Sequence, residues 1–356
     1  MKLGLKNLLD ALQPVPSTEK IFFADRLRVM IKAGISLSAA LQALAQESKN
    51  KRFAGVLSEL QKAVERGEQF SLALEKYPKI FSGFFINMIR VGEIAGALEQ
   101  NLKELSLQMH KDHALVSKIR GAMTYPIVVL LAAVFIITGI FTYVIPTLVA
   151  VFETLGGKLP LPTRVVIAIS KIITGYGPLT VLGLVLIAGF LVWFVRTKGQ
   201  RLWHAVLLNF LIIGPVAKKV NLARFSRTLG ALLSTDIPVI KGLEVTADVL
   251  GNVHYKTIVR QVSEEIKKGV AISEVLKKYP KLFPPLITTM IAVGEKSGTT
   301  DDMLREVAEF YEDDVDQITK NLATIIEPLL ILFLGLIIGG IAISIITPIY
   351  SLTQQF

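Results

Sequence analysis

The sequence reads EKYPKIFSGFFINMIRVGEIAGALEQNLKEL over residues 75–105 and KKYPKLFPPLITTMIAVGEKSGTTDDMLREV over residues 277–307. The two stretches align at a constant offset of 202 positions, and the alignment extends without a gap from Phe23–Pro146 to Phe225–Pro348. Of these 124 aligned positions, 28 are identical. Self-similarity of this length indicates that one structural unit was duplicated within the chain.

The composition indicates a membrane protein. The chain has 356 residues, of which 52% are hydrophobic and only 19% are charged. Three runs contain no Asp, Glu, Lys or Arg, namely residues 121–152, 172–195 and 328–356. Each run exceeds the roughly 20 residues that a helix needs to cross a bilayer, so we predict three transmembrane helices. The chain has no cysteine, which excludes disulfides and cysteine-ligated metals.

The distribution of positive charge predicts the topology. Of the 39 Lys and Arg residues, 18 lie in residues 1–120, three in 153–171, 18 in 196–327 and none in the C-terminal tail. Cytoplasmic segments are rich in Lys and Arg, so we expect the N-terminus inside and the C-terminus outside. The formal net charge of +10 is compatible with nucleic acid or an acidic partner, but a lipid-facing cytoplasmic surface explains it more simply.

These patterns divide the chain into nine segments. Residues 1–17 form a short amphipathic segment that packs on the membrane, on a partner or on its own domain. A break at Gly214 and Pro215 suggests that residues 205–217 form a short interfacial or buried helix. The predicted segments are the N-terminal segment 1–17, a first cytoplasmic domain 18–120, a span 121–152, an external loop 153–171 with an interfacial helix, a span 172–195, a connector 196–217, a second cytoplasmic domain 218–326, a span 327–350 and an external tail 351–356.

The two polar domains have helical and not strand periodicity, so the fold class is all-α, with two duplicated helical bundles of about six helices each. A short helix should stop before Pro78, with Tyr77 and Phe81 closing over the bundle. The second copy has Tyr279, Pro280 and Phe283 at the matching positions. We expect Pro126 and Pro328 to begin their membrane helices, because a missing N–H costs little there.

The sequences VGEIAG and VGEKSGTTDD predict tight turns. In the first turn, a helix should end at Gly92, and Gly96 should supply the backbone freedom for the turn. In the second turn, Gly294 and Gly298 take these roles, and Thr299 or Thr300 caps the next helix. Glu93 and Glu295 either contact a partner or a cation, or accept hydrogen bonds from the free backbone N–H groups of their own turns.

The sequence offers little catalytic chemistry. VGEKSGTT fails as a phosphate-binding loop, because Glu295 separates Gly294 from Lys296. His110 and His113 share a helix face that could hold a metal, but solvated side chains explain them more simply. The acidic residues near the third span either bind a cation or form a solvated helix face; they are Glu312, Asp313, Asp314 and Asp316. We therefore expect no enzymatic activity, no cofactor and no metal site.

Together, the duplicated YPKxF segments, the VGExxG turns, the membrane helices and LGGKLPLPTR at residues 155–164 resemble the type II secretion F-domain family. Members of this family are inner-membrane platform proteins of type II secretion systems and type IV pilus machines. The resemblance covers about residues 18–352.

The resemblance implies a multi-pass protein of the bacterial inner membrane that assembles filaments without being an enzyme. Its implied partners are a hexameric assembly ATPase, pilin or pseudopilin subunits, other inner-membrane assembly proteins, membrane lipid and further copies of itself, and they do not include nucleic acid. Gly92, Glu93, Gly96 and their second-copy equivalents then shape the partner-binding faces. A membrane transporter or channel subunit is the alternative, because internal repeats are common in that class.

Overall fold

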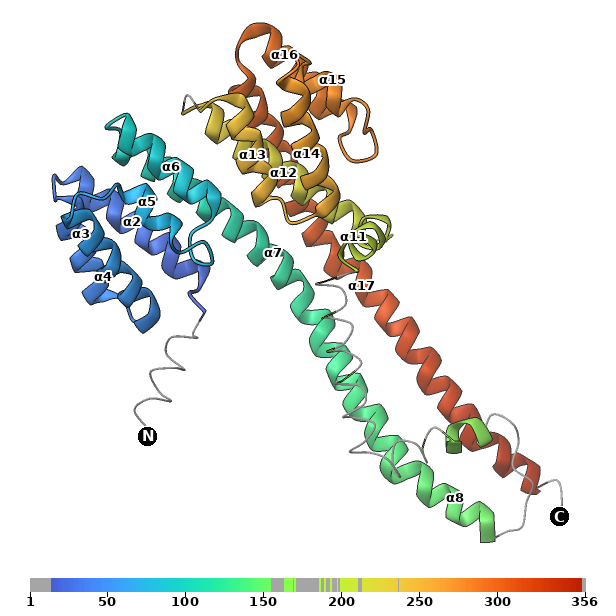
Figure 1. Ribbon diagram of the computed structural model, residues 1–356. Helices are drawn as coiled ribbons and strands as arrows, with labels where there is room; N and C mark the ends of the chain where they lie inside the picture. Colours follow the sequence, from blue (N-terminus) through green and yellow to red (C-terminus); the bar gives the residue numbers. More distant parts are fainter. Residues whose placement is uncertain are drawn as a thin grey trace. The chain divides into compact units, whose positions relative to one another are not determined.

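We describe the protein from a computed structural model. The structure describes residues 14–154, 163–168, 199–210, 213–235 and 237–353, together with the single positions 170, 186, 189, 193 and 197. These residues belong to two compact units, Met1–Ser117 with His204–Asp316, and Lys118–Trp203 with Gln317–Phe356. All regular elements among them are helices, which confirms the predicted all-α fold class (Figure 1).

In the first unit, each copy of the repeat contributes six helices, as the sequence predicted. The first copy consists of α2 (Ser17–Lys32), α3 (Leu37–Glu47), α4 (Lys51–Glu65), α5 (Phe70–Glu75), α6 (Gly83–Ile94) and the beginning of α7 (Leu98–Gly139). The second copy consists of α12 (Ile213–Leu233), α13 (Val239–Val249), α14 (Val253–Ile266), α15 (Ile272–Leu276), α16 (Pro285–Ser297) and the beginning of α17 (Thr300–Thr353). The helices α7 and α17 begin at matching positions of the repeat.

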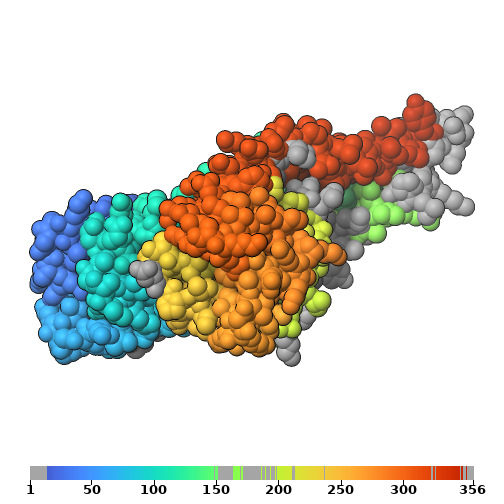
Figure 2. Space-filling model, turned by 90° about the horizontal axis from the view of Figure 1, so that it is seen from above, coloured from blue at the N-terminus to red at the C-terminus, as the bar shows by residue number. Residues whose placement is uncertain are grey.

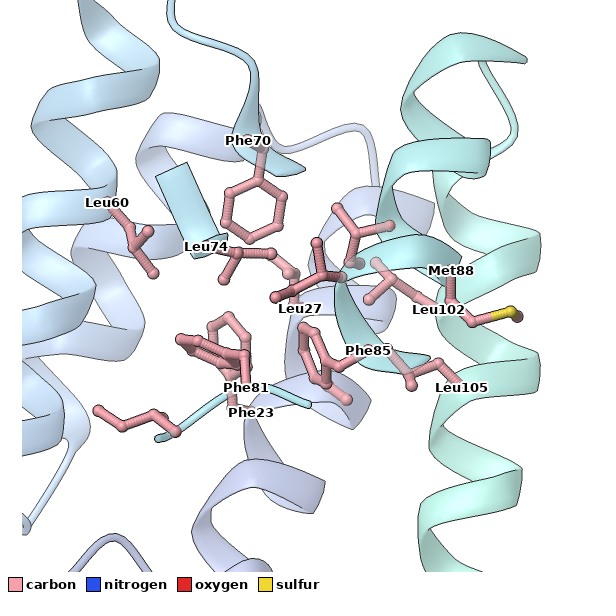
Figure 3. Close-up of a cluster of buried hydrophobic side chains, with 14 of the residues drawn as sticks. Phe23, Leu27, Leu60, Phe70, Leu74, Phe81, Phe85, Met88, Leu102 and Leu105 are labelled. Carbon is pink, nitrogen blue, oxygen red and sulfur yellow. The ribbon is translucent and has the colours of Figure 1, made fainter. Parts of the chain in front are cut away.

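An aromatic cluster forms the centre of the first copy (Figure 3). The rings of Phe81 and Phe85 lie 5.0 Å apart, and the rings of Phe23 and Phe53 meet edge to face at 5.6 Å. Phe81 is fully buried and lies six residues after the short helix α5, which ends before Pro78 as predicted. Burial of such side chains is the main force that holds a small helical bundle together.

The second copy repeats this cluster at the matching positions. The ring of Phe283 packs edge to face against Phe225 at 5.4 Å and against Tyr255 at 5.3 Å. The buried Tyr255 hydroxyl donates to the Leu282 carbonyl at 2.9 Å, so the extra polar atom has a partner. The aromatic residues of YPKIF and YPKLF therefore serve the same purpose in both copies, which is to close the core.

The two copies pack against each other within the first unit. Helix α6 contacts α13, and Ala231, Leu232, Ile237 and Val245 of the second copy are part of the first copy's hydrophobic core. Figure 2 shows α6, in cyan, beside α13, in yellow. Arg224 of α12 donates from Nε to Oδ1 of Asp112 on α7 at 2.6 Å. The duplicated domains thus form one continuous body.

The prediction that Pro126 and Pro328 begin their membrane helices is wrong. Pro126 lies inside α7, and Pro328 lies inside α17. Each long helix runs without interruption out of its bundle, and a proline in it removes only one backbone hydrogen bond. Interior prolines are tolerated in membrane helices when nearby groups satisfy the freed carbonyl, so the residue type did not mark a boundary here.

Two helices in the described residues are long and apolar enough to cross a membrane, within Leu98–Thr147 and Thr300–Ser344. A bent pair, α11 (Gln200–Asn209) with α12, also meets this test, with a bend of 108°. However, α12 carries the buried Phe225 and Leu229 of the second core, and we assign it to that domain. The segment 1–13 lies outside the described residues, and within the predicted span 172–195 only the single positions 186, 189 and 193 are described.

The bend between α11 and α12 falls earlier than Gly214 and Pro215, where the sequence predicted it. Helix α11 ends at Asn209, and α12 begins at Ile213, so both residues lie in the first turn of α12. A Cβ on Gly214 would lie 2.5 Å from the carbonyl oxygen of Leu208. The glycine is therefore required by the close approach of the two backbones, and the proline sits where its missing N–H costs nothing.

In the second unit, Phe141, Ile145 and Ile341 form a small apolar cluster between the two long helices. A π-helical turn at Ile140–Val144 leads from α7 into α8 (Ile145–Thr154). Thr163 donates from Oγ1 to the carbonyl of Ser344 at 2.7 Å, and Ser170 donates to the carbonyl of Phe141 at 2.7 Å. These contacts link the described part of the segment 163–170 to both long helices.

Candidate functional site

Glu295 lies in the last turn of α16 and caps a different helix. Its Oε1 accepts a hydrogen bond from the Ile272 N–H at 2.5 Å, and its Oε2 accepts one from the Ser273 N–H at 3.3 Å. These two amides begin α15, whose own N-cap residue, Ala271, offers no side-chain acceptor. A carboxylate at a helix N-terminus satisfies free N–H groups and favours the positive end of the helix dipole.

Glu93 makes the same contacts in the first copy. It accepts from the Phe70 N–H at 2.6 Å, from the Ser71 N–H at 3.1 Å and from the Ser71 hydroxyl at 2.7 Å. These groups begin α5, and its N-cap residue, Gln69, makes no side-chain capping bond. Both copies therefore use a glutamate five positions before the first residue of the long helix to tie a short helix to the bundle.

This geometry corrects one of the two sequence-based interpretations. We expected that, unless they met a partner or a cation, the glutamates would accept hydrogen bonds from their own turns. They instead accept from residues 22 or 23 positions earlier in the chain. The signal in the sequence for this contact is that neither Gln69 nor Ala271 is a favourable helix cap, so the N–H groups that follow them need a distant acceptor.

The glycines of the turns have two different purposes. Gly96 and Gly298 adopt φ values of 66° and 76°, the left-handed conformation that ends a helix, as predicted. Gly92 and Gly294 do not end their helices, since α6 continues to Ile94 and α16 to Ser297. A Cβ on Gly294 would lie 2.6 Å from the Cα of Thr300, so this glycine permits the close packing of the next helix.

The exposed tips of the two turns differ in chemistry. In the first copy, Ile94 is 76% exposed directly after Glu93. In the second copy, the matching residue is the exposed Lys296, and Asp301 and Asp302 follow in the first turn of α17. One scaffold thus presents an apolar tip in one copy and a charged tip in the other.

Beside the second turn lies a cavity of about 450 Å³. Its lining includes Glu295, Gly298, Ile272, Val239 and Asp301. The residues of the YPKxF segments make other contacts. Tyr77 pairs with Glu59, and Tyr279 donates to Gln261 at 2.7 Å. Pro78 and Pro280 are exposed on the surface.

The structure also places the residues that we considered as metal ligands. His110 pairs with Asp25 at 2.7 Å, and within the described ranges no three His, Cys, Asp or Glu residues are arranged to hold a metal ion. The acidic face of α17 is not simply solvated: Glu312 binds Arg227, and Asp314 pairs with Lys219 at 2.7 Å. These carboxylates are engaged in contacts between helices.

The fold and these turns define a class of protein: a membrane-anchored pair of duplicated helical bundles. The family model described as type II secretion system (T2SS), protein F matches residues 23–146 and again 225–348. These are the boundaries of the repeat in the sequence. The chain belongs to this family, as its motifs predicted.

Several curated relatives resemble the chain over nearly its whole length. It is 34% identical to the type IV pilus assembly protein PilC of Myxococcus xanthus, with 99% of this chain and 86% of the relative covered. It is 35% identical to PilC of Thermus thermophilus, with 97% and 85% covered. It is 32% identical to the type II secretion system protein F of Aeromonas hydrophila, with 95% and 87% covered. Family membership and the apolar helices identify an inner-membrane protein.

Proposed function

We propose that this chain is the platform protein of a type IV pilus or type II secretion machine and couples a cytoplasmic assembly ATPase to the polymerisation of pilin or pseudopilin subunits. The observation that carries the proposal is the match of both copies to the family, together with relatives whose names specify pilus assembly and type II secretion. In this proposal both bundles are cytoplasmic, three helices cross the membrane and the C-terminus is external.

The duplicated architecture supports a mechanical role. A hydrophobic core with aromatic residues at matching positions stabilises each bundle. Each long helix runs without interruption from its bundle into an apolar segment. Displacement of a bundle by a partner is therefore transmitted along a helix into the membrane, since a continuous helix is a stiff element. No separate hinge or catalytic group is needed for this coupling.

The different tips allow the copies to bind different partners. The apolar Ile94 tip suits a hydrophobic contact, whereas Lys296 with Asp301 and Asp302 suits a charged one. In this proposal Glu93 and Glu295 act indirectly, because they fix the helices next to the tips. Gly92, Gly96, Gly294 and Gly298 shape the same turns.

The test is binding of the full-length protein, reconstituted in nanodiscs, to the assembly ATPase encoded by the same organism, with ATP and with ADP. Ile94→Asp changes the first tip, and Lys296→Glu changes the second tip. Neither side chain is buried, so both variants should fold. We expect nucleotide-sensitive binding that one of the two variants weakens and the other does not.

Absence of binding by folded wild-type protein in either nucleotide would overturn the coupling role. Flux of ions or solutes through reconstituted protein without an ATPase would instead support the transporter alternative. Complementation of a strain that lacks the gene then distinguishes a type IV pilus machine from a type II secretion machine, because pilus assembly and protein secretion are measured separately.

A further inference from the structure

Helix α11 is fixed to the second bundle by one face and leaves an apolar face uncovered. On the inner face Leu208 is buried, and the Nδ1 of His204 accepts a hydrogen bond from the Val253 N–H at 3.1 Å. On the outer face Leu202 and Val206 are 71% and 55% exposed, and Phe210, the residue directly after the helix, is 55% exposed. Trp203 is also exposed, at 48%. Aromatic and aliphatic side chains on one helix face are typical of helices that lie in a bilayer surface.

A cavity lies beside α11, where it meets the YPKLF segment. Its volume is about 460 Å³, within the roughly 300–1,000 Å³ of ligand pockets. Ala205, Leu208, Pro280 and Leu282 provide apolar surface. Lys218, Lys278, Lys281 and His254 provide positive or titratable groups, and no Asp or Glu is among the described residues that line the cavity. This is an apolar cavity with a cationic rim.

The first copy neutralises one of these lysine positions. Lys76, which matches Lys278, pairs with Glu68, and the hydroxyl of Tyr77 pairs with Glu59. In the second copy the residues that match Glu68 and Glu59 are Val270 and Gln261. Glu265 lies near enough to Lys278 to interact with it electrostatically, but its carboxylate pairs with Lys268 at 2.8 Å. The second copy therefore lacks two carboxylates that the first copy places beside Lys76 and Tyr77.

We propose that this cavity binds an anionic phospholipid of the membrane surface, with the phosphate at Lys278 and Lys281 and an acyl chain against α11. Lysines near an anionic membrane surface are attracted to it, and their aliphatic stems can cover apolar surface at the same time. Helix α11 begins five residues after the predicted span 172–195, so the chain holds it within about 18 Å of the end of that span. The lipid anchors the second bundle to the bilayer.

This site is independent of the proposed coupling to an ATPase, because it requires only that the chain lies in a membrane. Its test therefore cannot fail merely because the motor assignment is wrong. The chain provides its own probe, since Trp193 and Trp203 are its two tryptophans. In the Trp193→Phe background, fluorescence comes from Trp203 on α11 alone.

The experiment reconstitutes this full-length variant in phosphatidylcholine vesicles and adds brominated phosphatidylglycerol or brominated phosphatidylcholine. Bromine in the acyl chain quenches tryptophan only at short range. We expect stronger quenching by phosphatidylglycerol. The double change Lys278→Gln and Lys281→Gln should lower the apparent affinity for phosphatidylglycerol roughly 30-fold, because two lysine contacts are lost.

The matched control is Lys76→Gln with Lys79→Gln, which removes the equivalent lysines of the first copy and should leave quenching unchanged. Circular dichroism and thermal unfolding establish that both double variants are folded. Equal quenching by the two lipids, or an equal loss in both double variants, would overturn the proposal. Loss of the preference when inorganic phosphate is added would show a site for free anions and would also overturn it.

Discussion

Arg227 donates from Nε to Oε1 of Glu312 at 2.6 Å, at the two positions where the first copy pairs Asp25 with His110. The repeat thus retains a polar pair between its first and last helices but exchanges which helix carries the acid. Arg227 is only 6% exposed, so the second-copy pair is nearly removed from water. The pair thus maintains the same helix contact in both copies with different residue types.

Replacing Arg227 with Met should destabilise the second bundle, by up to about 3–5 kcal/mol, because Glu312, which is only 19% exposed, loses its nearest partner and keeps only Lys111 at 3.7 Å. Thermal unfolding of the purified full-length protein measures the effect. The exposed Arg305, which pairs with Asp302 at 3.8 Å, is the control, and Arg305→Met should change stability by about 0–1 kcal/mol. The double variant R227M/E312M should recover most of the loss; failure to recover it would contradict the pairwise explanation.

Glu295→Ala should release the N-terminus of α15, at a cost of about 2 kcal/mol for charge-assisted hydrogen bonds. Hydrogen exchange should accelerate at the amides of Ile272 and Ser273, which are the two donors to this carboxylate. Glu306→Ala removes an exposed carboxylate on α17 and serves as the control. Unchanged exchange at both amides would show that the capping contact does not stabilise α15 in solution.

The same substitution bears on assembly. If Glu295 acts by fixing the turn, Glu295→Ala and Glu93→Ala should both reduce filament assembly in proportion to the stability that each variant loses. Loss of assembly by a variant of unchanged stability would instead identify that glutamate as a direct partner contact. Assembly at the wild-type level, although the glutamate no longer caps the short helix, would show that these turns have no role in filament assembly.

Gly294→Ala should be among the most damaging glycine substitutions in the second bundle, because the added methyl would lie 2.6 Å from a backbone atom of the next helix. Small-to-large changes in packed sites typically cost about 1–3 kcal/mol. Gly55 in the middle of α4 is the control, since a Cβ there meets nothing within 4 Å. Gly55→Ala should stabilise its helix by about 0.5–1 kcal/mol, so the two substitutions should shift the unfolding temperature in opposite directions.

Acid should weaken the docking of α11. Burial, and to a lesser extent the neighbouring His254, lower the pKa of His204. The unfolded chain then binds a proton more readily than the folded one, so the stability from neutral His204 is complete above about pH 6.5 and is lost as the pH falls below it. Protonation also removes the acceptor for the Val253 N–H.

The measurement compares the unfolding temperature of the wild type and of His204→Gln at pH 7.5 and pH 5. The glutamine keeps an acceptor but cannot titrate, so the difference between the two proteins should be smaller at the lower pH. His113→Gln on the exposed part of α7 controls for the general effect of removing a histidine. A constant difference across this range would contradict the role of His204.

Many features followed from the sequence because they are local or repetitive. The offset of 202 positions located both copies, helical periodicity identified the bundles, and Pro78 and Gly96 ended a helix and shaped a turn as expected. The family followed as well, because its motifs occur twice in register. Each of these inferences depends on residues that are close together in the chain or on a comparison of the chain with itself.

The predictions of helix boundaries were wrong where the structure depends on contacts between residues far apart in the chain. Pro126 suggests a boundary, yet α7 continues through it, because neither the bundle nor the apolar segment requires the helix to stop. Gly92 and Gly294 suggest helix ends, but they serve the packing of the following helix. Proline and glycine each allow several backbone structures, and the residues that pack against them determine which of these structures forms.

The sequence by itself determined that this is an all-α membrane protein of duplicated domains and that it belongs to the type II secretion F family. Only the tertiary structure decided that Glu295 caps α15 and that Arg227 meets Glu312. It alone also showed that α11 and the YPKLF segment enclose a lysine-rimmed cavity. The physical reason is that hydrophobic periodicity is written along the chain, whereas hydrogen bonds and ion pairs depend on which distant groups packing brings within about 3 Å.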